Sequence, residues 1–319
     1  MVPKHENKTS VVSWPMNGIK DISDIEFNLW AELLKERTGI VLSKQRKSFL
    51  LSKLTIRMQE LGIEKYREYF SYVTFATTGS RVEWEVLVDR LTVHETRFFR
   101  DARALSFITK NYFEKLDFSK ATPNVHIWSV GCATGEEPYS LLMYIDKYLK
   151  DKNKKCYLAV TASDISQKAL LVGKKAIYPC DRFQSVSSEY IDNYLEKVDA
   201  THYQIKEALR KRICFNRFNL VNLDKNPAEK MNIIVCQNVL IYFNRETRIM
   251  ILNQLVERLA PGGLLIMGAG EISGWINKKI SPVQQDGVLA FQKKTTAAEV
   301  VATGASQTTL ADELQEREA

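Results

Sequence analysis

The order of apolar and polar residues changes once along the chain. Between residues 21 and 90, apolar residues recur every three or four positions, the spacing of one face of an α-helix. Gly39 and Gly62 stand where two of these patterns end, as glycines do at helix C-termini. The pattern predicts a small all-α domain over 21–90.

From about residue 124, short β-branched runs alternate with helical patterns. Helices are expected between four predicted strands, which cover 124–130, 156–163, 230–238 and 262–268. This alternation is typical of a doubly wound, mainly parallel sheet. It is interrupted over 177–217, where polar, aromatic and charged residues indicate an inserted small subdomain. The sequence therefore predicts an α/β domain over 91–294.

Both ends of the chain lack such patterns. Residues 1–20 contain no apolar segment followed by a small-residue cleavage site, and we expect them to be flexible. Residues 295–319 are rich in Thr, Ala, Ser, Gln and Glu, which predicts a disordered tail. No stretch is apolar enough for a bilayer span. We expect a cytoplasmic protein without membrane insertion.

Composition narrows the classes of function. The five cysteines form no CxxC pair and the four histidines have no metal spacing, so we expect reduced thiols and no metal site. The net charge is +7 and the pI is near 9.0. This charge favours an acidic partner, either nucleic acid, a phosphate-bearing ligand or an acidic protein face. A mildly basic solvated surface explains it equally well.

A glycine-containing segment joins the first predicted strand to its helix. Gly131 lets the backbone turn tightly beside a ligand. Pro138 suits a first helical position, which makes Glu137 the expected cap with its carboxylate toward the crevice. A carboxylate there repels a pyrophosphate and attracts a cation. The segment therefore suits S-adenosylmethionine (SAM), with its ammonium and sulfonium, better than NAD; a glycine turn with a capping acid is the structural alternative.

Polar residues also follow the next two predicted strands. Asp164 ends the second strand, where an acid accepts ribose hydroxyls or caps the following helix. Gln237 and Asn238 end the third strand and Tyr242 follows it; these side chains either enter the same crevice or cap the strand and pack in the core. Ligands of open parallel sheets bind at this edge.

The segment 92–101 connects the two predicted domains. Thr96 and Arg100 are four residues apart and are expected to share a helix face. Arg100 suits bidentate binding of a carboxylate, and pairing with Asp101 or Glu95 at the surface is the alternative.

Together these segments resemble the chemotaxis receptor methyltransferase family (CheR). The similarity runs from about residue 25 to 293 and includes LTVHETRFFRD, GCATGEEPYS, ASDIS, FNL and QNVLIYF in order. It implies a Rossmann-like SAM-dependent methyltransferase domain with an inserted small β subdomain, preceded by a small all-α domain. It also implies transfer of a methyl group from SAM to glutamate carboxylates on the cytoplasmic methylation helices of chemoreceptors, with S-adenosylhomocysteine (SAH) as product.

The resemblance implies roles for individual residues. Arg100 and Tyr242 are expected nearest the transferred methyl group. Contacts to the cofactor are expected from Gly131 and from His94, Thr96, Arg100, Glu137, Asp164, Asn219, Leu220, Gln237 and Asn238. His94 and Gln237 depart from the family's usual asparagine and arginine, although both still form hydrogen bonds.

A basic segment in the predicted all-α domain indicates a function for the positive charge. From Lys35 to Arg67 there are nine basic and three acidic residues, a balance of +6. We expect this face to dock on acidic receptor helices, with contacts from Arg46, Lys47, Lys53 and Arg57. The family's tethering loop for a receptor's C-terminal pentapeptide is glycine-rich, whereas 194–215 contains no glycine. We therefore expect no pentapeptide tether, and a monomer.

Two other classes of function stay open at this point. A nucleic-acid methyltransferase also explains the charge, although the strand end lacks the Asn/Asp-Pro-Pro-aromatic motif of amino-directed enzymes. A non-catalytic receptor-binding regulator that keeps the fold is the second alternative, and the presence of Glu137, Asp164, Arg100 and Tyr242 argues against it.

Overall fold

The structure is a computed structural model that describes residues 22–75, 77–92, 95–119, 121–225, 230–285 and 287–295. The expected flexible amino terminus lies outside the described residues, and so does the expected tail from residue 296 onward. Among the described residues, none of the helices combines the length and apolar character needed to cross a bilayer.

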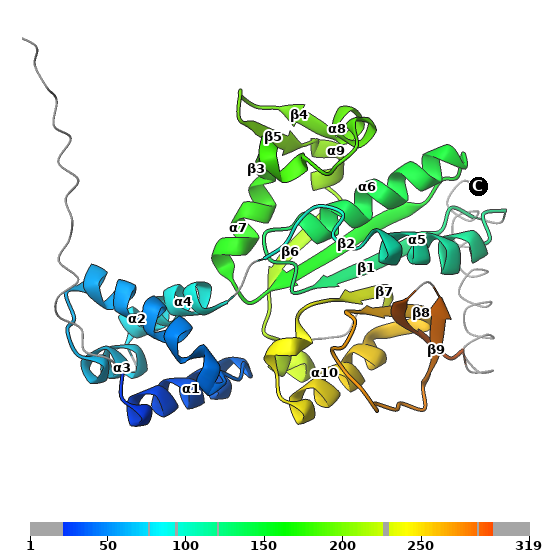
Figure 1. Ribbon diagram of the computed structural model, residues 1–319. Coiled ribbons are helices and arrows are strands. Elements are labelled where there is room, and N and C mark those ends of the chain that lie inside the picture. Colours follow the sequence, from blue (N-terminus) through cyan, green and yellow to red (C-terminus); the bar gives the residue numbers. More distant parts are fainter. Residues whose placement is uncertain are drawn as a thin grey trace, which may run out of the picture.

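A helical domain forms the amino-terminal part of the described chain (Figure 1). Its elements are α1 (Asp24–Thr38), η1 (Lys44–Arg46), α2 (Lys47–Leu61), α3 (Tyr66–Thr74) and α4 (Thr78–Leu91). Gly39 and Gly62 end α1 and α2 with φ of 77° and 69°, as the glycine positions predicted. The domain has its own core, built around Trp30, Leu54 and Tyr69.

The second domain is built on a seven-stranded sheet of order β6-β2-β1-β7-β8-β10-β9. The parallel strands are β6 (Ile213–Arg217), β2 (Tyr157–Asp164), β1 (Asn124–Val130), β7 (Met231–Cys236) and β8 (Leu259–Met267). Two antiparallel strands complete the edge, β10 (Val288–Lys293) and β9 (Ile280–Gln285). The order reverses next to β1, and such a reversal is where ligands bind in open α/β sheets.

Helices cover both faces of this sheet. Alternate residues of each strand point to opposite faces, so the apolar residues of one strand contribute to two clusters. Ile127 packs in one core cluster and Trp128 in the other. The first cluster is covered by α5 (Ala102–Asn111), α6 (Glu136–Asp151) and α7 (Gln167–Lys175). The second is covered by α10 (Arg245–Arg258) and η4 (Leu220–Lys225). The predicted Rossmann-like fold is confirmed.

A small antiparallel sheet of order β3-β5-β4 projects from the domain, at the top of Figure 1. It contains β3 (Ile177–Pro179), β4 (Leu195–Lys197) and β5 (His202–Ile205), with η3 (Cys180–Phe183), α8 (Ser188–Tyr194) and α9 (Glu207–Arg210) beside it. The predicted small β subdomain is therefore present. Its expected end at residue 217 is wrong, because Ile213–Arg217 form β6 and pair with β2 in the main sheet.

The helical domain contacts the α/β domain close to the C-terminal ends of the strands. The amide of Val41 donates a hydrogen bond to the carbonyl of Tyr242 (2.8 Å), and Asn219 Nδ2 donates to the carbonyl of Arg37 (2.9 Å). A side chain at Gly39 would lie 2.4 Å from Val221, so only glycine permits this approach. The loop after α1 thus becomes a wall of the cleft between the domains.

Candidate active site

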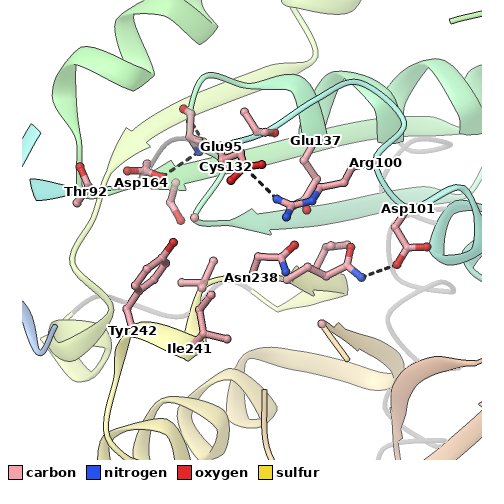
Figure 2. A pocket seen from close by; sticks show the side chains of 18 of the residues that line it. Thr92, Glu95, Arg100, Asp101, Cys132, Glu137, Asp164, Asn238, Ile241 and Tyr242 are labelled. Atoms are coloured by element: carbon pink, nitrogen blue, oxygen red, sulfur yellow. Dashed lines mark hydrogen bonds between the residues drawn. The ribbon is translucent and has the colours of Figure 1, made fainter. Parts of the chain in front are cut away.

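A cavity of about 760 Å³ opens where β1, β2 and β7 end and the helical domain approaches (Figure 2). All the described residues that were predicted to contact the cofactor or the methyl group line this cavity. His94 lies outside the described residues. Three non-glycine residues in the cavity wall have positive φ, namely Phe99, Ala133 and Asn238. Such backbone conformations are uncommon and concentrate where ligands bind.

The loop after β1 is held in one conformation by its neighbours. The carbonyl of Ser163 accepts hydrogen bonds from the amides of Gly131 (2.7 Å) and Cys132 (3.0 Å). Gly131 has a φ of 69°, and a Cβ at this position would lie 2.3 Å from Val239. The glycine therefore serves both the turn and the close approach of the β7 loop.

Glu137 is not the helix cap that Pro138 predicted. The helix α6 begins at Glu136 with Gly135 as its N-cap, so Glu137 lies in the first turn and Pro138 is the third helical residue. Proline is tolerated there because the first-turn amides have no partner within the helix. The expected position in the crevice holds, because the Glu137 side chain lines the cavity.

Burial dominates the electrostatics of Glu137 and raises its pKa to about 7. Ser129 Oγ donates a hydrogen bond of 2.6 Å to Glu137 Oε1 and partly opposes this rise, as does the charge of Arg100. A carboxylate with little solvation gains much from a nearby cation. Glu137 is thus suited to an ammonium group.

Asp164 ends β2, and both of its carboxylate oxygens take part in the local structure. Oδ2 accepts from the amide of Ala133 and Oδ1 from the amide of Ser166, each at 2.9 Å. Capping of α7 falls to Ser166, whose hydroxyl accepts from Ala169. The capping alternative for Asp164 is therefore wrong, and its carboxylate lies at the cavity, where an acceptor suits ribose hydroxyls.

The loop after β7 provides the opposite wall. Gln237 Nε2 donates to Asp101 Oδ2 at 3.0 Å, and Tyr242 ends the short helix η5 (Leu240–Tyr242). The guanidinium of Arg46 lies 5.4 Å from the centre of the Tyr242 ring. Burial raises the pKa of Tyr242, and the charges of Arg46 and Arg100 oppose that rise. The phenol therefore stays protonated at neutral pH.

The linker reaches the cavity without the predicted helix. Residues 95–97 have no regular structure, a turn covers 98–100, and α5 starts only at Ala102. Phe98 is buried against Tyr178 and Phe183, and this packing fixes the turn. Thr96 and Arg100 still line the same cavity, and Arg100 Nη1 donates to the carbonyl of Glu95 at 2.9 Å.

Several residues at the site were not predicted from the sequence. Asp101 caps α5 and accepts from Gln237, although its sequence position indicated only a surface partner for Arg100. Glu271 is fully buried behind the β7 loop. The helical domain contributes Thr38, Ile40, Leu42 and Arg46 to the cavity. The only sequence signal for that approach is Gly39, because the two domains have separate hydrophobic patterns.

The residues proposed for docking differ in their availability. Arg57 is unsuited to docking because its guanidinium binds the buried carboxylate of Glu83 through two hydrogen bonds of 2.9 and 2.6 Å. Lys47 forms an ion pair with Asp24 at 2.8 Å. Arg46 is exposed at the cavity, and Lys53 lies over the ring of Phe49. Fewer basic side chains are therefore available for docking than the formal charge of this segment indicates.

Comparisons with known proteins agree with this geometry. Residues 25–92 match the CheR methyltransferase all-alpha domain, and residues 94–287 match the CheR methyltransferase SAM binding domain. A chemotaxis protein methyltransferase 1 of Pseudomonas aeruginosa is 30% identical over 78% of this chain and 90% of its own length. A chemotaxis protein methyltransferase of Borreliella burgdorferi is 28% identical over 79% of this chain and 89% of its own.

A third relative, chemotaxis protein methyltransferase Cher2 of Pseudomonas putida, is 27% identical over 85% of this chain and 98% of its own length. These similarities extend over both domains, so they concern the whole described fold. SAM is the cofactor, and a cavity lined by the carboxylates of Glu137 and Asp164 suits a cationic ligand. The chain belongs to the CheR family of SAM-dependent chemotaxis methyltransferases.

Proposed function

We propose that this enzyme esterifies glutamate side chains on the cytoplasmic helices of chemoreceptors. The observation that carries the proposal is that acidic and basic side chains line the same cavity. Glu137 in the first turn of α6 and Asp164 at the end of β2 contribute carboxylates, and Arg46, Arg100 and Tyr242 line the same cavity from other segments. The carboxylates suit the cationic donor, and the guanidinium groups suit an acidic acceptor.

The donor's orientation follows from the side chains that line the cavity. The carboxylate of Glu137 binds the ammonium of SAM, and Asp164 accepts hydrogen bonds from the ribose hydroxyls. Gln237, Asn238, Asn219 and Leu220 complete the contacts proposed for the cofactor. SAM supplies a methyl group already activated by its attachment to a sulfonium.

Little further activation is needed from the protein. A glutamate side chain has a pKa of about 4.3 in water and is already a carboxylate at neutral pH. One carboxylate oxygen forms a bond to the methyl carbon while the carbon–sulfur bond breaks, and no proton is transferred. The enzyme's task is to hold oxygen, carbon and sulfur in line and to exclude water. Arg100 and Tyr242 orient the reacting groups by hydrogen bonds.

The proposed receptor partner fits the position of the basic face. Arg46 precedes α2 and reaches the cavity, and the exposed Lys44 and half-buried Lys53 lie on the same part of the helical domain. An acidic receptor helix placed along α2 would therefore present its carboxylates at the cavity. We expect the enzyme to act as a cytoplasmic monomer.

A competition between a receptor fragment and RNA tests the class of methyl acceptor. The protein is incubated with SAM, a chemoreceptor cytoplasmic fragment and RNA together, and the products are analysed by mass spectrometry. The proposal predicts single methyl additions on glutamate-containing receptor peptides and an unchanged RNA. Methylated RNA beside an unmodified receptor would favour a nucleic-acid enzyme, and no methylation of either would favour a non-catalytic regulator.

A further inference from the structure

Glu271 is a buried carboxylate that the proposed chemistry does not use. It follows β8, is fully buried and lies behind the loop that extends from β7. Its Oε1 accepts hydrogen bonds from the amides of Val239 (2.7 Å) and Leu240 (3.0 Å), and its Oε2 accepts from the amide of Gly268 (2.8 Å). Three main-chain donors thus converge on one carboxylate.

The amides of Val239 and Leu240 belong to the segment that forms one wall of the cavity. Asn238, immediately before them, has a φ of 62°, and Tyr242 follows two residues after Leu240. A side chain at Gly268 would lie 2.8 Å from Glu271 Oε2 and 3.1 Å from the amide of Asn238. The loop, the carboxylate and the end of β8 therefore fit together without spare room.

Arg248 of α10 supports the same segment from the other side. Its guanidinium donates to the carbonyls of Phe243 (2.8 Å) and Ile241 (3.3 Å), and to the carbonyl of Glu271 (2.8 Å). The turn that carries Tyr242 is thereby fixed through its carbonyls by a cation and through its amides by an anion. Charge-assisted hydrogen bonds of this kind hold a backbone more firmly than neutral ones.

We propose that Glu271 is a positioning residue for methyl transfer, which acts by holding the Asn238–Tyr242 turn so that the Tyr242 phenol faces the reacting groups. Glu271 does not line the cavity and so has no direct contact with the reactants. The proposal rests on the role proposed above for Tyr242. It differs from a simple contribution to folding because it predicts that the effect of Glu271 on turnover passes through that phenol.

The substitution Glu271→Gln separates charge from shape. A glutamine keeps the volume but replaces one acceptor oxygen by an NH₂ group. Whichever way the amide turns, this group faces either the amide of Gly268 or the amides of Val239 and Leu240, and donor then opposes donor. The turn must shift to relieve this conflict.

The test is a double-mutant cycle with Tyr242→Phe, in which methyl transfer from SAM to a receptor fragment is measured at saturating concentrations of both. We expect Glu271→Gln to lower kcat at least tenfold in the otherwise wild-type chain and less than threefold in the Tyr242→Phe background. Gly268→Ala, which displaces the same carboxylate without removing it, should show the same pattern if Glu271→Gln fails to fold.

Glu83→Gln is the matched control, because Glu83 is a similarly buried carboxylate with several hydrogen bonds in the helical domain. Glu83→Gln should change kcat by the same factor in the otherwise wild-type chain and in the Tyr242→Phe background. Losses caused by Glu271→Gln that are equal in both backgrounds, or a kcat within twofold of wild type, would overturn the proposal. A wild-type protein that methylates no receptor would instead refute the proposed function.

Discussion

Two carboxylates, Glu137 in the first turn of α6 and Asp164 at the end of β2, face one cavity and receive hydrogen bonds from different donors. Asp164 accepts hydrogen bonds from the backbone amides of Ala133 and Ser166. Glu137 accepts a hydrogen bond from the Ser129 hydroxyl, and burial raises its pKa to about 7. Its charge state therefore changes within the physiological range, and the proposed ammonium contact makes cofactor binding depend on pH.

The pH dependence of SAH binding tests the role of Glu137. An ammonium binds the carboxylate and not the acid, so bound cofactor lowers the pKa of Glu137 and binding below pH 7 releases a proton. From a pKa of about 7 in the free protein, affinity should rise roughly fivefold between pH 6 and pH 7. Calorimetry in two buffers of different ionisation enthalpy measures both effects.

Glu137→Gln is the control for this titration, since an amide of similar shape does not ionise. Its affinity for SAH should be lower and almost independent of pH in that range. A wild-type profile as flat as that of the variant would show that Glu137 does not meet the ammonium.

Asp164 tests the ribose contact. Replacement by alanine should weaken SAH binding by about 1–3 kcal/mol, because buried hydroxyl donors of the ligand lose their acceptor. Asp199→Ala, which removes an exposed carboxylate in the β4–β5 turn, serves as control and should bind as wild type does. Unchanged affinity in a folded Asp164→Ala variant would remove the assignment.

The sequence predicts which residues line the cavity better than it predicts which residues they contact. Asp164 and Tyr242 were identifiable because they follow strand patterns, and parallel strands end at one edge. Asp101 and Glu271 were not, because their significance depends on contacts with residues 136 and more than 30 positions away. The raised pKa of Glu137 likewise results from burial, which residue type alone does not determine.

At the scale of elements, the loops after β1 and β7 pack against each other and restrict each other's conformation. Gly131 admits Val239, and the carbonyl of Ser163 at the end of β2 holds the β1 loop. Periodicity predicted four strands of the sheet and the helices between them. It missed β6, whose pattern is embedded in the polar insertion, and the edge strands β9 and β10, which are short antiparallel additions after the alternating units.

The basic face of the helical domain makes a prediction at the same scale. Reversing Lys44 and Lys53 to glutamate should raise the apparent KM for receptor and flatten its dependence on salt, because attraction to an acidic helix is lost. SAH affinity should not change. These two lysines are chosen because Arg57 and Lys47 already have carboxylate partners and Arg46 lines the cavity.

The matched control reverses Lys152 and Lys155, which are exposed in the turn after α6 and outside the cavity lining. It changes the net charge by the same amount without altering the helical domain. Equal receptor kinetics for the two double variants at low salt would place the docking surface elsewhere.

At the scale of the whole molecule, the cavity lies between domains that have separate cores. The sequence predicts both domains, since each has its own periodicity, but not that the loop after α1 becomes part of the cavity wall. That contact depends on one glycine, Gly39, on a backbone hydrogen bond from Val41 to Tyr242 and on one from the Asn219 side chain to the carbonyl of Arg37, which the apolar pattern does not reveal. The proposed docking on α2 and the proposed chemistry at Tyr242 thus concern adjoining parts of the molecule.

The inserted subdomain bears on how the enzyme finds its receptor. Its edge strand β4 has only three residues, Leu195–Lys197, and the carboxylate of Asp199 closes the following turn through hydrogen bonds from Thr201. A short edge offers few main-chain partners to an added strand. We expect no micromolar binding of a receptor's C-terminal pentapeptide in a calorimetric titration. A dissociation constant near 1 μM, about −8 kcal/mol, that a scrambled peptide does not share would refute this expectation.

The bond formed to the receptor tests the central claim most directly. Methyl-labelled SAM, this protein and a receptor cytoplasmic fragment are incubated, the fragment is isolated, and mild alkali is applied. A glutamate methyl ester predicts that the label enters the receptor fragment, depends on Arg100, and is released by alkali as volatile methanol. Label that resists alkali, or that Arg100→Ala transfers as well as the wild-type protein does, would contradict the account.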